Sequence, residues 1–372
     1  MGIGIKGQNS LWPLEDSLEE LAQLARAGGA QVVGELTQRI DRPTQVYLGK
    51  GKLEDLKALK TTSQYDTVIF DDELSPVQQR NLEQFLDSKV IDRTALILDV
   101  FSQSAQTREG QLQVELAQHR YLLPRLRGQW SHLERLGGGI GTRGPGESQL
   151  ETDRRLIRKR IQKLERDLQE VRQHRGLYRK RRKEQGVPVV ALVGYTNSGK
   201  STLFNSLGRA SVITKDKLFS TLDPVTRRIF LEGNLPLLLT DTVGFIQKLP
   251  PSLIAAFRAT LEELNEADVI LHVVDISHRN APEQVQVVQH IIADLGLTHK
   301  PCVMALNKID LLFDESHRLE DTIGTTFPGP MAMISALKKR GLEDLLLKIQ
   351  QAIKILPFTP HIGITPTVIN PR

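Results

Sequence analysis

Apolar and polar residues alternate along the first part of the chain in a pattern that predicts strands and helices in turn. Short runs rich in Val, Ile and Tyr are typical of buried strands, whereas the segments between them repeat their apolar residues every three or four positions, as helices do. The expected strands cover residues 2–7, 31–38, 44–49, 65–70 and 88–92. This order predicts a small α/β domain with a parallel sheet over residues 1–106.

Two helix starts in this domain have a recognisable signature. Ser17 and Glu20 form the pattern of a capping box, which predicts a helix that opens at Ser17 and stops at Gly28–Gly29. Ser75 followed by Pro76 predicts a second helix with the serine as its N-cap. A β-α unit therefore starts the chain.

Between residues 107 and 186 the pattern changes to long polar helical sequence, broken by a glycine-rich stretch at residues 137–146. This predicts a helical hairpin with a glycine-rich tip. Gly139–Gly144 also spells G-x-G-x-x-G, but helical sequence on both sides excludes the strand that a dinucleotide-binding turn requires. One stripe at helical spacing is expected to pack against the partner helix, formed by Leu156, Arg160, Lys163, Leu164, Leu168 and Val171.

Strand-like runs return over residues 187–356. Two of them, at residues 227–233 and 235–241, are joined by a Gly-Asn pair, which is a two-residue hairpin signal. The other runs lie between helical segments, so this region predicts a mostly parallel α/β sheet with one antiparallel edge strand. Residues 357–372 are punctuated by proline, and we take them as a peripheral tail.

The positive charge of the chain is local rather than spread. The net charge is only +5, but residues 154–183 carry fourteen Lys and Arg against three Asp and Glu. So few acidic residues for pairing along the helix favour a partner over a solvated face. The single cysteine, Cys302, excludes an internal disulfide. Neither a signal peptide nor an apolar run of membrane-spanning length is present in the sequence, so we expect a cytoplasmic protein that acts as a monomer.

The candidate chemistry begins at residues 187–207, where an apolar strand breaks into a glycine-bounded loop and then a helix. Gly194, Gly199, Lys200 and Ser201 match G-x-x-x-x-G-K-[ST] in that context. Backbone N–H groups of such a loop cradle phosphates, the lysine reaches the outer phosphates, and the serine hydroxyl can ligate Mg²⁺. The predicted phosphate-binding residues are Gly194, Tyr195, Thr196, Asn197, Ser198, Gly199, Lys200, Ser201 and Thr202.

Two further motifs follow the ends of apolar strands. Asp241 and Gly244 form D-x-x-G, which suits a Mg²⁺ ligand acting through water and a backbone N–H for a γ-phosphate. Asn307, Lys308 and Asp310 form N-K-x-D. The Asp310 carboxylate can accept both N–H donors on one edge of guanine, a pair that adenine lacks, so the motif predicts guanine specificity.

Three more positions complete the predicted site. Ser335 and Ala336 would close the base pocket with a backbone N–H to the guanine O6. The predicted Mg²⁺ ligands are Ser201, Thr221 and Asp241, the last through water. Phe245 stands where Ras-like enzymes place the glutamine that orients water, which predicts slow hydrolysis without a partner.

Four motifs in this order resemble the guanine-nucleotide domain of translation-factor-related GTPases. With GGGIGTRGPGESQLETDRR (137–155), FSTLDPVTRR and DTVGFIQKLP, the chain is similar to the HflX family of ribosome-associated GTPases over about residues 16–356. The resemblance implies a P-loop GTPase domain preceded by a small α/β domain and a helical hairpin. It also implies that the hairpin enters the large ribosomal subunit near the peptidyl transferase centre, and that GTP drives the splitting of stalled or stressed ribosomes.

The implied partners are GTP, GDP and the ribosomal RNA of the large subunit, and the implied cofactor is Mg²⁺. Contacts with this RNA are expected from Arg143, Arg154, Arg155, Arg158, Arg160 and Lys163, which lie in the basic hairpin or its tip.

Two other functions fit parts of the sequence. The chain could be an RNA-binding assembly scaffold whose nucleotide site only acts as an occupancy switch. An ATP-driven P-loop enzyme is disfavoured by Asn307 and Asp310. Residues 1–100 spell no second Walker A motif, which leaves the use of ATP by the N-terminal region open.

Overall fold

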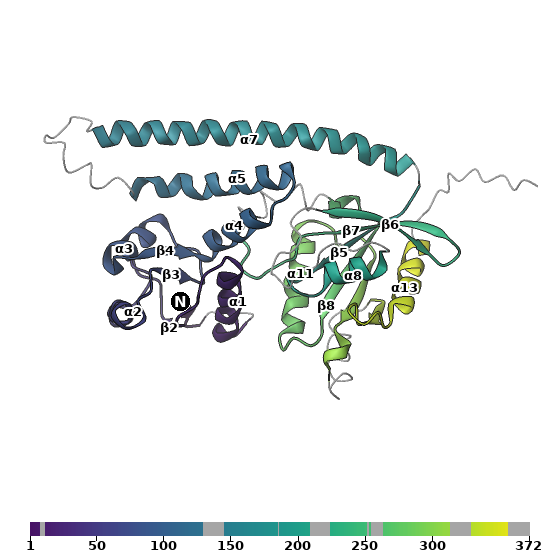
Figure 1. Ribbon diagram of the computed structural model, residues 1–372, viewed down its shortest axis with the longest axis horizontal. Coiled ribbons are helices and arrows are strands. Elements are labelled where there is room, and N and C mark those ends of the chain that lie inside the picture. The colour runs from purple at the N-terminus through teal and green to yellow at the C-terminus, as the bar shows by residue number, and fades with distance from the viewer. Residues whose placement is uncertain are drawn as a thin grey trace, which may run out of the picture.

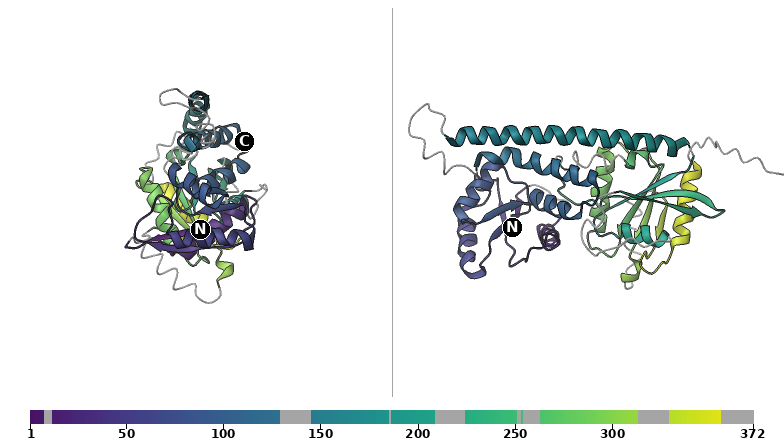
Figure 2. Two further views of the ribbon diagram at one scale, coloured as in Figure 1. Left: turned by 90° about the vertical axis from the view of Figure 1, so that its left-hand side faces the viewer. Right: turned by 45° about the horizontal axis from the view of Figure 1, so that its top comes forward.

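Two α/β bodies lie side by side below a pair of long helices in Figure 1. The structure is a computed structural model that describes residues 1–7, 12–128, 145–184, 186–208, 224–250, 253, 263–312 and 329–355. The first body, here the N-terminal domain, runs from β1 (Gly2–Ile5) to α4 (Arg93–Ser104). The second, here the C-terminal domain, runs from β5 (Val189–Gly194) to α13 (Leu342–Ile355). The helix α7 (Pro145–Glu184) extends along both bodies (Figure 2). Within the described ranges, none of the helices has the length and apolar character needed to cross a membrane.

The N-terminal domain alternates short strands and helices. Its elements are β1 (Gly2–Ile5), α1 (Leu14–Ala27), β2 (Thr37–Ile40), α2 (Lys50–Ser63), β3 (Thr67–Phe70), α3 (Pro76–Leu86), β4 (Lys89–Asp92) and α4 (Arg93–Ser104). The pairs β1–β2 and β3–β4 are both parallel, as predicted. Met1 joins the two pairs, because its amino group donates to Ile69 O and its carbonyl accepts from Asp71 N.

Two of the expected elements in this domain are wrong. Residues 44–49 form turns instead of a strand, with Tyr47 in the left-handed region at φ 63° and its ring packed against Phe70. The run 31–38 contributes only its end, in β2. A buried tyrosine has the same apolar character in a turn as in a strand, so the sequence pattern did not distinguish the two.

The predicted capping box at Ser17 is also wrong, whereas the predicted N-cap at Ser75 is confirmed and proves to be part of a capping box. The helix α1 already begins at Leu14 after Pro13, so Ser17 lies inside it and donates its hydroxyl to Asp71 Oδ2 at 2.7 Å. Ser75 accepts from Gln78 N, and the Gln78 side chain accepts from Ser75 N at 3.0 Å. The difference is that Ser17 faces the protein interior, where a distant partner takes its hydroxyl.

The helical hairpin is confirmed and consists of α5 (Arg108–Leu122) and α7 (Pro145–Glu184), with the 3₁₀ turn η1 (Leu123–Gly128) following α5. Its seam is built by the buried side chains of Leu116, Leu164 and Leu168. The predicted stripe is therefore right at two positions and wrong at Leu156, which is 57% exposed. Arg160 and Lys163 are exposed as well, since a charged head stays in water.

The C-terminal domain is a six-stranded sheet in the order β10-β9-β8-β5-β7-β6. The strands are β5 (Val189–Gly194), β6 (Val225–Leu231), β7 (Leu235–Asp241), β8 (Val269–Asp275), β9 (Cys302–Asn307) and β10 (Met331–Met333). Only the β6–β7 pair is antiparallel, which confirms the predicted edge strand. The connecting loop has three residues, Glu232–Asn234, rather than two, because Leu231 pairs with Leu235.

Helices cover both faces of this sheet. On one face α8 (Lys200–Leu207) and α13 (Leu342–Ile355) pack through Leu203, Phe204 and Leu345, and on the other α11 (Ala281–Asp294) packs through Val288. The short 3₁₀ turn η2 (Ile309–Leu311) follows β9. Because β5, β7, β8 and β9 are parallel, their carboxyl ends meet at one edge of the sheet, where ligands bind in open α/β folds.

Candidate nucleotide-binding site

The predicted phosphate loop joins β5 to α8, and two of its glycines are required by their neighbours. A Cβ on Gly194 would lie 2.2 Å from the carbonyl oxygen of Val273, and one on Gly199 would lie 2.3 Å from Asn307 Nδ2. Gly199 is also the N-cap of α8, at φ 92°. The loop can therefore reach this tight path only with glycine at both ends, and it presents the N-terminus of α8 to an anion.

Lys200 and Ser201 open this helix inside the site. The Lys200 ammonium donates to Tyr195 O at 2.8 Å, and burial lowers its pKa to about 8 in spite of the opposing charge of Asp241. Ser201 Oγ donates to Asp241 Oδ2 at 2.7 Å, so two of the predicted Mg²⁺ ligands lie side by side. Hydroxyl and carboxylate oxygens are the donors that Mg²⁺ prefers, so these residues fit the ion. The third predicted ligand, Thr221, lies outside the described residues.

The remaining residues of the phosphate loop are held mainly by hydrogen bonds within the loop and the first turns of α8. Ser198 N donates to Tyr195 O, and Asn197 takes a left-handed conformation at φ 60°. Thr196 is almost fully buried, and the backbone carbonyl of Thr202 accepts a hydrogen bond from the Ser206 hydroxyl. The Ser198 hydroxyl is buried with no hydrogen-bond partner in the described part of the chain.

The D-x-x-G segment lies directly against the phosphate loop. Phe245 N donates to Gly194 O at 3.0 Å, and Thr196 N donates to Phe245 O at 2.7 Å. A Cβ on Gly244 would lie 3.0 Å from Lys200 Nζ. The Phe245 ring is 2% exposed and packs in the apolar core below α11, so it has no access to water at the site.

Asn307 connects the phosphate loop with the predicted base pocket. Its amide nitrogen donates to Ser198 O at 2.8 Å, and its amide oxygen accepts from Ala336 N at 2.9 Å. Lys308, in a left-handed conformation, pairs with Asp275 at 2.6 Å. The sequence predicted contact with the nucleotide for these residues but gave no sign of this bridging role.

Asp310 is the candidate acceptor for the guanine edge. A hydrogen bond with the Ser335 side chain holds the pKa of Asp310 below its usual value, helped by Lys338 at 3.8 Å. The carboxylate is therefore ionised at neutral pH, as guanine recognition requires. The structure brings Asp310, Ser335 and Ala336 together beside Asn307, as the sequence predicted.

We expect Asp310→Asn to weaken guanine nucleotides and to favour xanthine nucleotides, because an amide can donate to the xanthine O2 that a carboxylate repels. Each guanine donor left without an acceptor costs roughly 1–3 kcal/mol. Competition of GTP and XTP for the site measures the change. The exposed Asp294→Asn is the matched control, and a variant at position 310 that keeps the GTP preference would place the base pocket elsewhere.

The predicted RNA-contacting residues lie apart from this site, on α7. Arg160 pairs with Glu115 of α5 at 2.6 Å, and Arg158 lies 3.9 Å from Glu151. Arg154, Arg155 and Lys163 form no ion pair within the described ranges. Arg143 lies outside the described residues.

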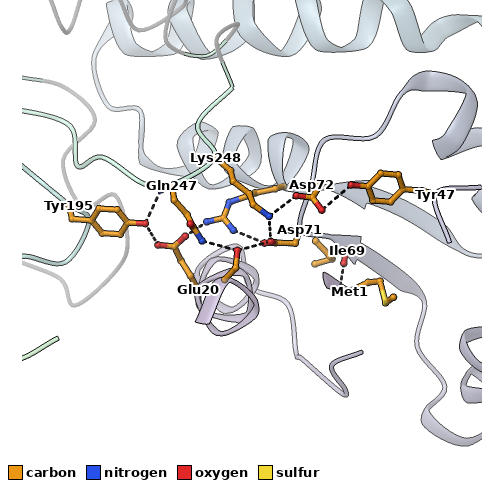
Figure 3. A network of polar contacts seen from close by, with 11 residues as sticks. Met1, Glu20, Tyr47, Ile69, Asp71, Asp72, Tyr195, Gln247 and Lys248 are labelled. Carbon is orange, nitrogen blue, oxygen red and sulfur yellow. Dashed lines mark hydrogen bonds and ion pairs between the residues drawn. The ribbon is translucent and has the colours of Figure 1, made fainter. Parts of the chain in front are cut away.

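One set of contacts at the site was not predicted, although Tyr195 itself was among the predicted phosphate-binding residues. Tyr195, Gln247 and Lys248 tie the phosphate loop and the D-x-x-G segment to the N-terminal domain (Figure 3). The Tyr195 ring also stacks on Trp12, with ring centroids 5.7 Å apart. Their partners lie more than 170 positions away along the chain, so no local pattern could have indicated them.

Family profiles match most of the chain. Residues 15–102 match the "GTP-binding GTPase N-terminal" family, residues 104–182 the "GTP-binding GTPase Middle Region" and residues 189–308 the "50S ribosome-binding GTPase" family.

Curated relatives and a solved structure extend these matches. A protein named GTPase HflX from Caldanaerobacter subterraneus subsp. tengcongensis is 49% identical over 340 residues, which is 91% of this chain and 77% of the relative. GTPase HflX of Escherichia coli K12 is 46% identical over 307 residues, with 82% and 72% covered. The crystal structure of a complex of SsGBP with GDP has a TM-score of 0.51 at 26% identity, covering 95% of this chain and 97% of that one.

Proposed function

The chain belongs to the HflX family of GTPases, and on that premise we propose that it binds the large ribosomal subunit and uses GTP to separate the subunits of stalled or stressed ribosomes. The nucleotide site supports GTP as the ligand, because the phosphate loop, D-x-x-G and the guanine-binding motif meet at one sheet edge. Mg²⁺ held by Ser201 and, through water, by Asp241 would neutralise charge on the β- and γ-phosphates.

The observation that carries the ribosome part of the proposal is the exposed basic face of α7. Arg155, Arg158 and Lys163 are exposed, and the seam with α5 uses the opposite, leucine-bearing side. Such a face suits the phosphates of folded RNA, which give affinity without a sequence code. Arg160 is expected to contribute less than its neighbours, because Glu115 already accepts two hydrogen bonds or ion pairs from its guanidinium.

We expect the triple variant Arg155→Gln, Arg158→Gln, Lys163→Gln to bind the large subunit more weakly and with a flatter salt dependence. The log–log slope should fall by about 0.7–0.9 for each phosphate that the variant no longer neutralises. Co-sedimentation with 50S subunits across a salt series measures both quantities. Arg160→Gln is the matched control, and an equal decrease in that variant would mean that hairpin rigidity rather than RNA binding sets the affinity.

Shortening the tip, residues 137–146, should leave most of the binding and remove subunit separation, because the tip would supply the steric conflict and α7 the charge. Light scattering of 70S ribosomes with GTP or a non-hydrolysable analogue follows the separation. If the shortened chain separates ribosomes as well as the wild type, the hairpin only anchors the protein. If the wild type binds 50S subunits without separating 70S ribosomes, the assembly-scaffold function is favoured instead.

A further inference from the structure

The half of the hairpin that lies next to its tip has no buried apolar side chain to hold it. The last buried side chain of α5 is that of Ala117, and none of residues 118–126 is buried. In α7, none of residues 151–160 is buried, whereas Leu164 and Leu168 further along form the seam. This exposed stretch of α7 spans about 15 Å at the rise of an α-helix. The position of the tip end of the hairpin therefore depends on polar contacts.

One arginine supplies such contacts at this end, where η1 lies beside α3 of the N-terminal domain (Figure 1). The Arg125 side chain, in η1, is 11% exposed. A guanidinium carries five N–H donors in a planar fork. That of Arg125 donates four hydrogen bonds, to Leu74 O at 2.7 Å, Tyr121 O at 3.0 Å, Gln79 Oε1 at 3.1 Å and Asp92 Oδ2 at 3.2 Å. Three of these acceptors belong to the N-terminal domain, so the fork joins η1 to it.

The charged acceptor, Asp92, is itself held firmly at the end of β4. Its side chain is 1% exposed and accepts from Leu74 N at 3.1 Å and from Ala95 N at 2.9 Å, where it caps α4. It also accepts from the Tyr121 hydroxyl at 2.9 Å, and the Arg125 guanidinium lies 3.6 Å from the centre of the Tyr121 ring. The same carboxylate therefore fixes both the end of α5 and η1.

This arrangement determines direction more than stability. A buried ion pair is often no more stabilising than an apolar pair of the same size, because both charges lose their hydration. Four hydrogen bonds from one planar group to α3, to the β3–α3 loop, to β4 and to α5 do, however, fix the orientation of η1 on the sheet. The neighbouring pair of Arg120 and Glu165 joins α5 to α7, but its side chains are 38% and 45% exposed, so it contributes little.

We propose that Arg125 is a positioning residue for the separation of ribosomal subunits. With Asp92 it fixes the tip end of the hairpin to the N-terminal domain, so that the sheet of this domain resists movement of the tip when the tip meets the ribosome. Binding to the large subunit stays with the exposed face of α7. This role presupposes the proposed function, because it needs a hairpin tip that acts on the ribosome.

The test measures the maximal rate of subunit separation apart from the protein concentration that gives half of it. We expect Arg125→Met to lower the maximal rate about 10-fold or more, the effect that loss of one hydrogen bond to a charged group has on an equilibrium. The half-saturating concentration and the affinities for 50S subunits and GTP should change by about twofold or less, since those sites are distant. Light scattering of 70S ribosomes, co-sedimentation and nucleotide titration measure these quantities.

Two further variants distinguish a fixed direction from charge alone. Arg125→Lys keeps the charge, but one ammonium cannot reach the acceptors on α3, β4 and α5 together, so it should restore only part of the rate. Tyr121→Phe keeps the ring and removes one donor to Asp92, so it should lower the maximal rate by less than Arg125→Met. A full wild-type rate in Arg125→Lys would mean that charge alone suffices and would overturn the positioning role.

Arg120→Gln is the matched control. Arg120 pairs with Glu165 at 2.6 Å between the two helices of the hairpin and has no contact with Asp92. Its loss should leave the rate unchanged, because exposed ion pairs contribute little. An equal decrease in this variant would assign the effect to general rigidity of the hairpin and would overturn the proposal. An unchanged maximal rate in a folded Arg125→Met protein would overturn it as well.

The contact itself can be measured without ribosomes. Cys302 is the single cysteine, so Cys302→Ser gives a background for nitroxide labels at the exposed positions Gln84→Cys on α3 and Lys159→Cys on α7. We expect Arg125→Met to broaden the distance distribution between these labels in double electron–electron resonance, and Arg120→Gln to leave it unchanged. An unchanged distribution in Arg125→Met would contradict the proposal. A wild type that binds 50S subunits without separating ribosomes would instead overturn the proposed function, and with it the role assigned to Arg125.

Discussion

Replacing Lys200 by alanine should lower the affinity for GTP and GDP by about 10²- to 10⁴-fold, since hydrogen bonds to charged groups contribute roughly 1.5–3 kcal/mol each and the ammonium can make two. The structure places this ammonium inside the phosphate loop, where it now donates to Tyr195 O. A phosphate offers the same group a charged acceptor. Titration with a fluorescent GDP or GTP analogue measures the decrease in affinity.

A lower nucleotide affinity supports the assignment of the loop only if the Lys200→Ala protein remains folded. Lys200 is buried but donates to a single backbone carbonyl among the described residues, so its removal should leave the sheet and α8 in place, which circular dichroism can check. Lys354→Ala on the exposed face of α13 is the control for removal of a lysine. Unchanged nucleotide affinity in a folded Lys200→Ala protein would contradict the assignment of the loop.

The nucleotide site was predictable because its chemistry is local. Each motif directly follows an apolar strand, and the carboxyl ends of parallel strands meet at one edge, so the position of Asp241 and Asn307 near Lys200 follows from the pattern alone. The sequence motif explains the two glycines of the loop only in part. Gly194 and Gly199 are also required by Val273 O and the Asn307 amide, which come from other strands.

In the hairpin, the helical spacing of apolar residues is not enough to predict which of them are buried. With so few apolar residues on α7, the spacing alone does not separate Leu156, which is exposed, from Leu164 and Leu168, which form the seam. What decides between them is the position of Leu116 on α5. Arg160 is predicted to face RNA because acidic residues are scarce along its own helix, yet its partner Glu115 lies on the other helix.

The domain interface could not be predicted at all. The Ser17 and Glu20 pair matches a capping box, a pattern of two residues three positions apart, and the signal is overridden by partners from distant parts of the chain. The Ser17 hydroxyl donates to the Asp71 carboxylate, and the Tyr195 hydroxyl donates to the Glu20 carboxylate. The failure of a strong local rule at this place marks the residues that connect the two domains.

The rate of GTP hydrolysis should be low for the chain alone and should rise roughly 10³–10⁵-fold with ribosomes, the range known for partner-stimulated GTPases. The Phe245 ring lies in the core and cannot orient water. A group that orients the attacking water, or the ordering of such a group in this chain, must therefore come from the partner.

Phosphate release under single-turnover conditions, with and without 50S subunits, measures this stimulation. The Arg155, Arg158 and Lys163 triple variant is the internal control, because it should keep the basal rate and need more 50S subunits for the same stimulation. Isolated 30S subunits should have little effect, since the proposed binding is to the large subunit. A fast rate without ribosomes would contradict the prediction and would place a water-orienting group within this chain.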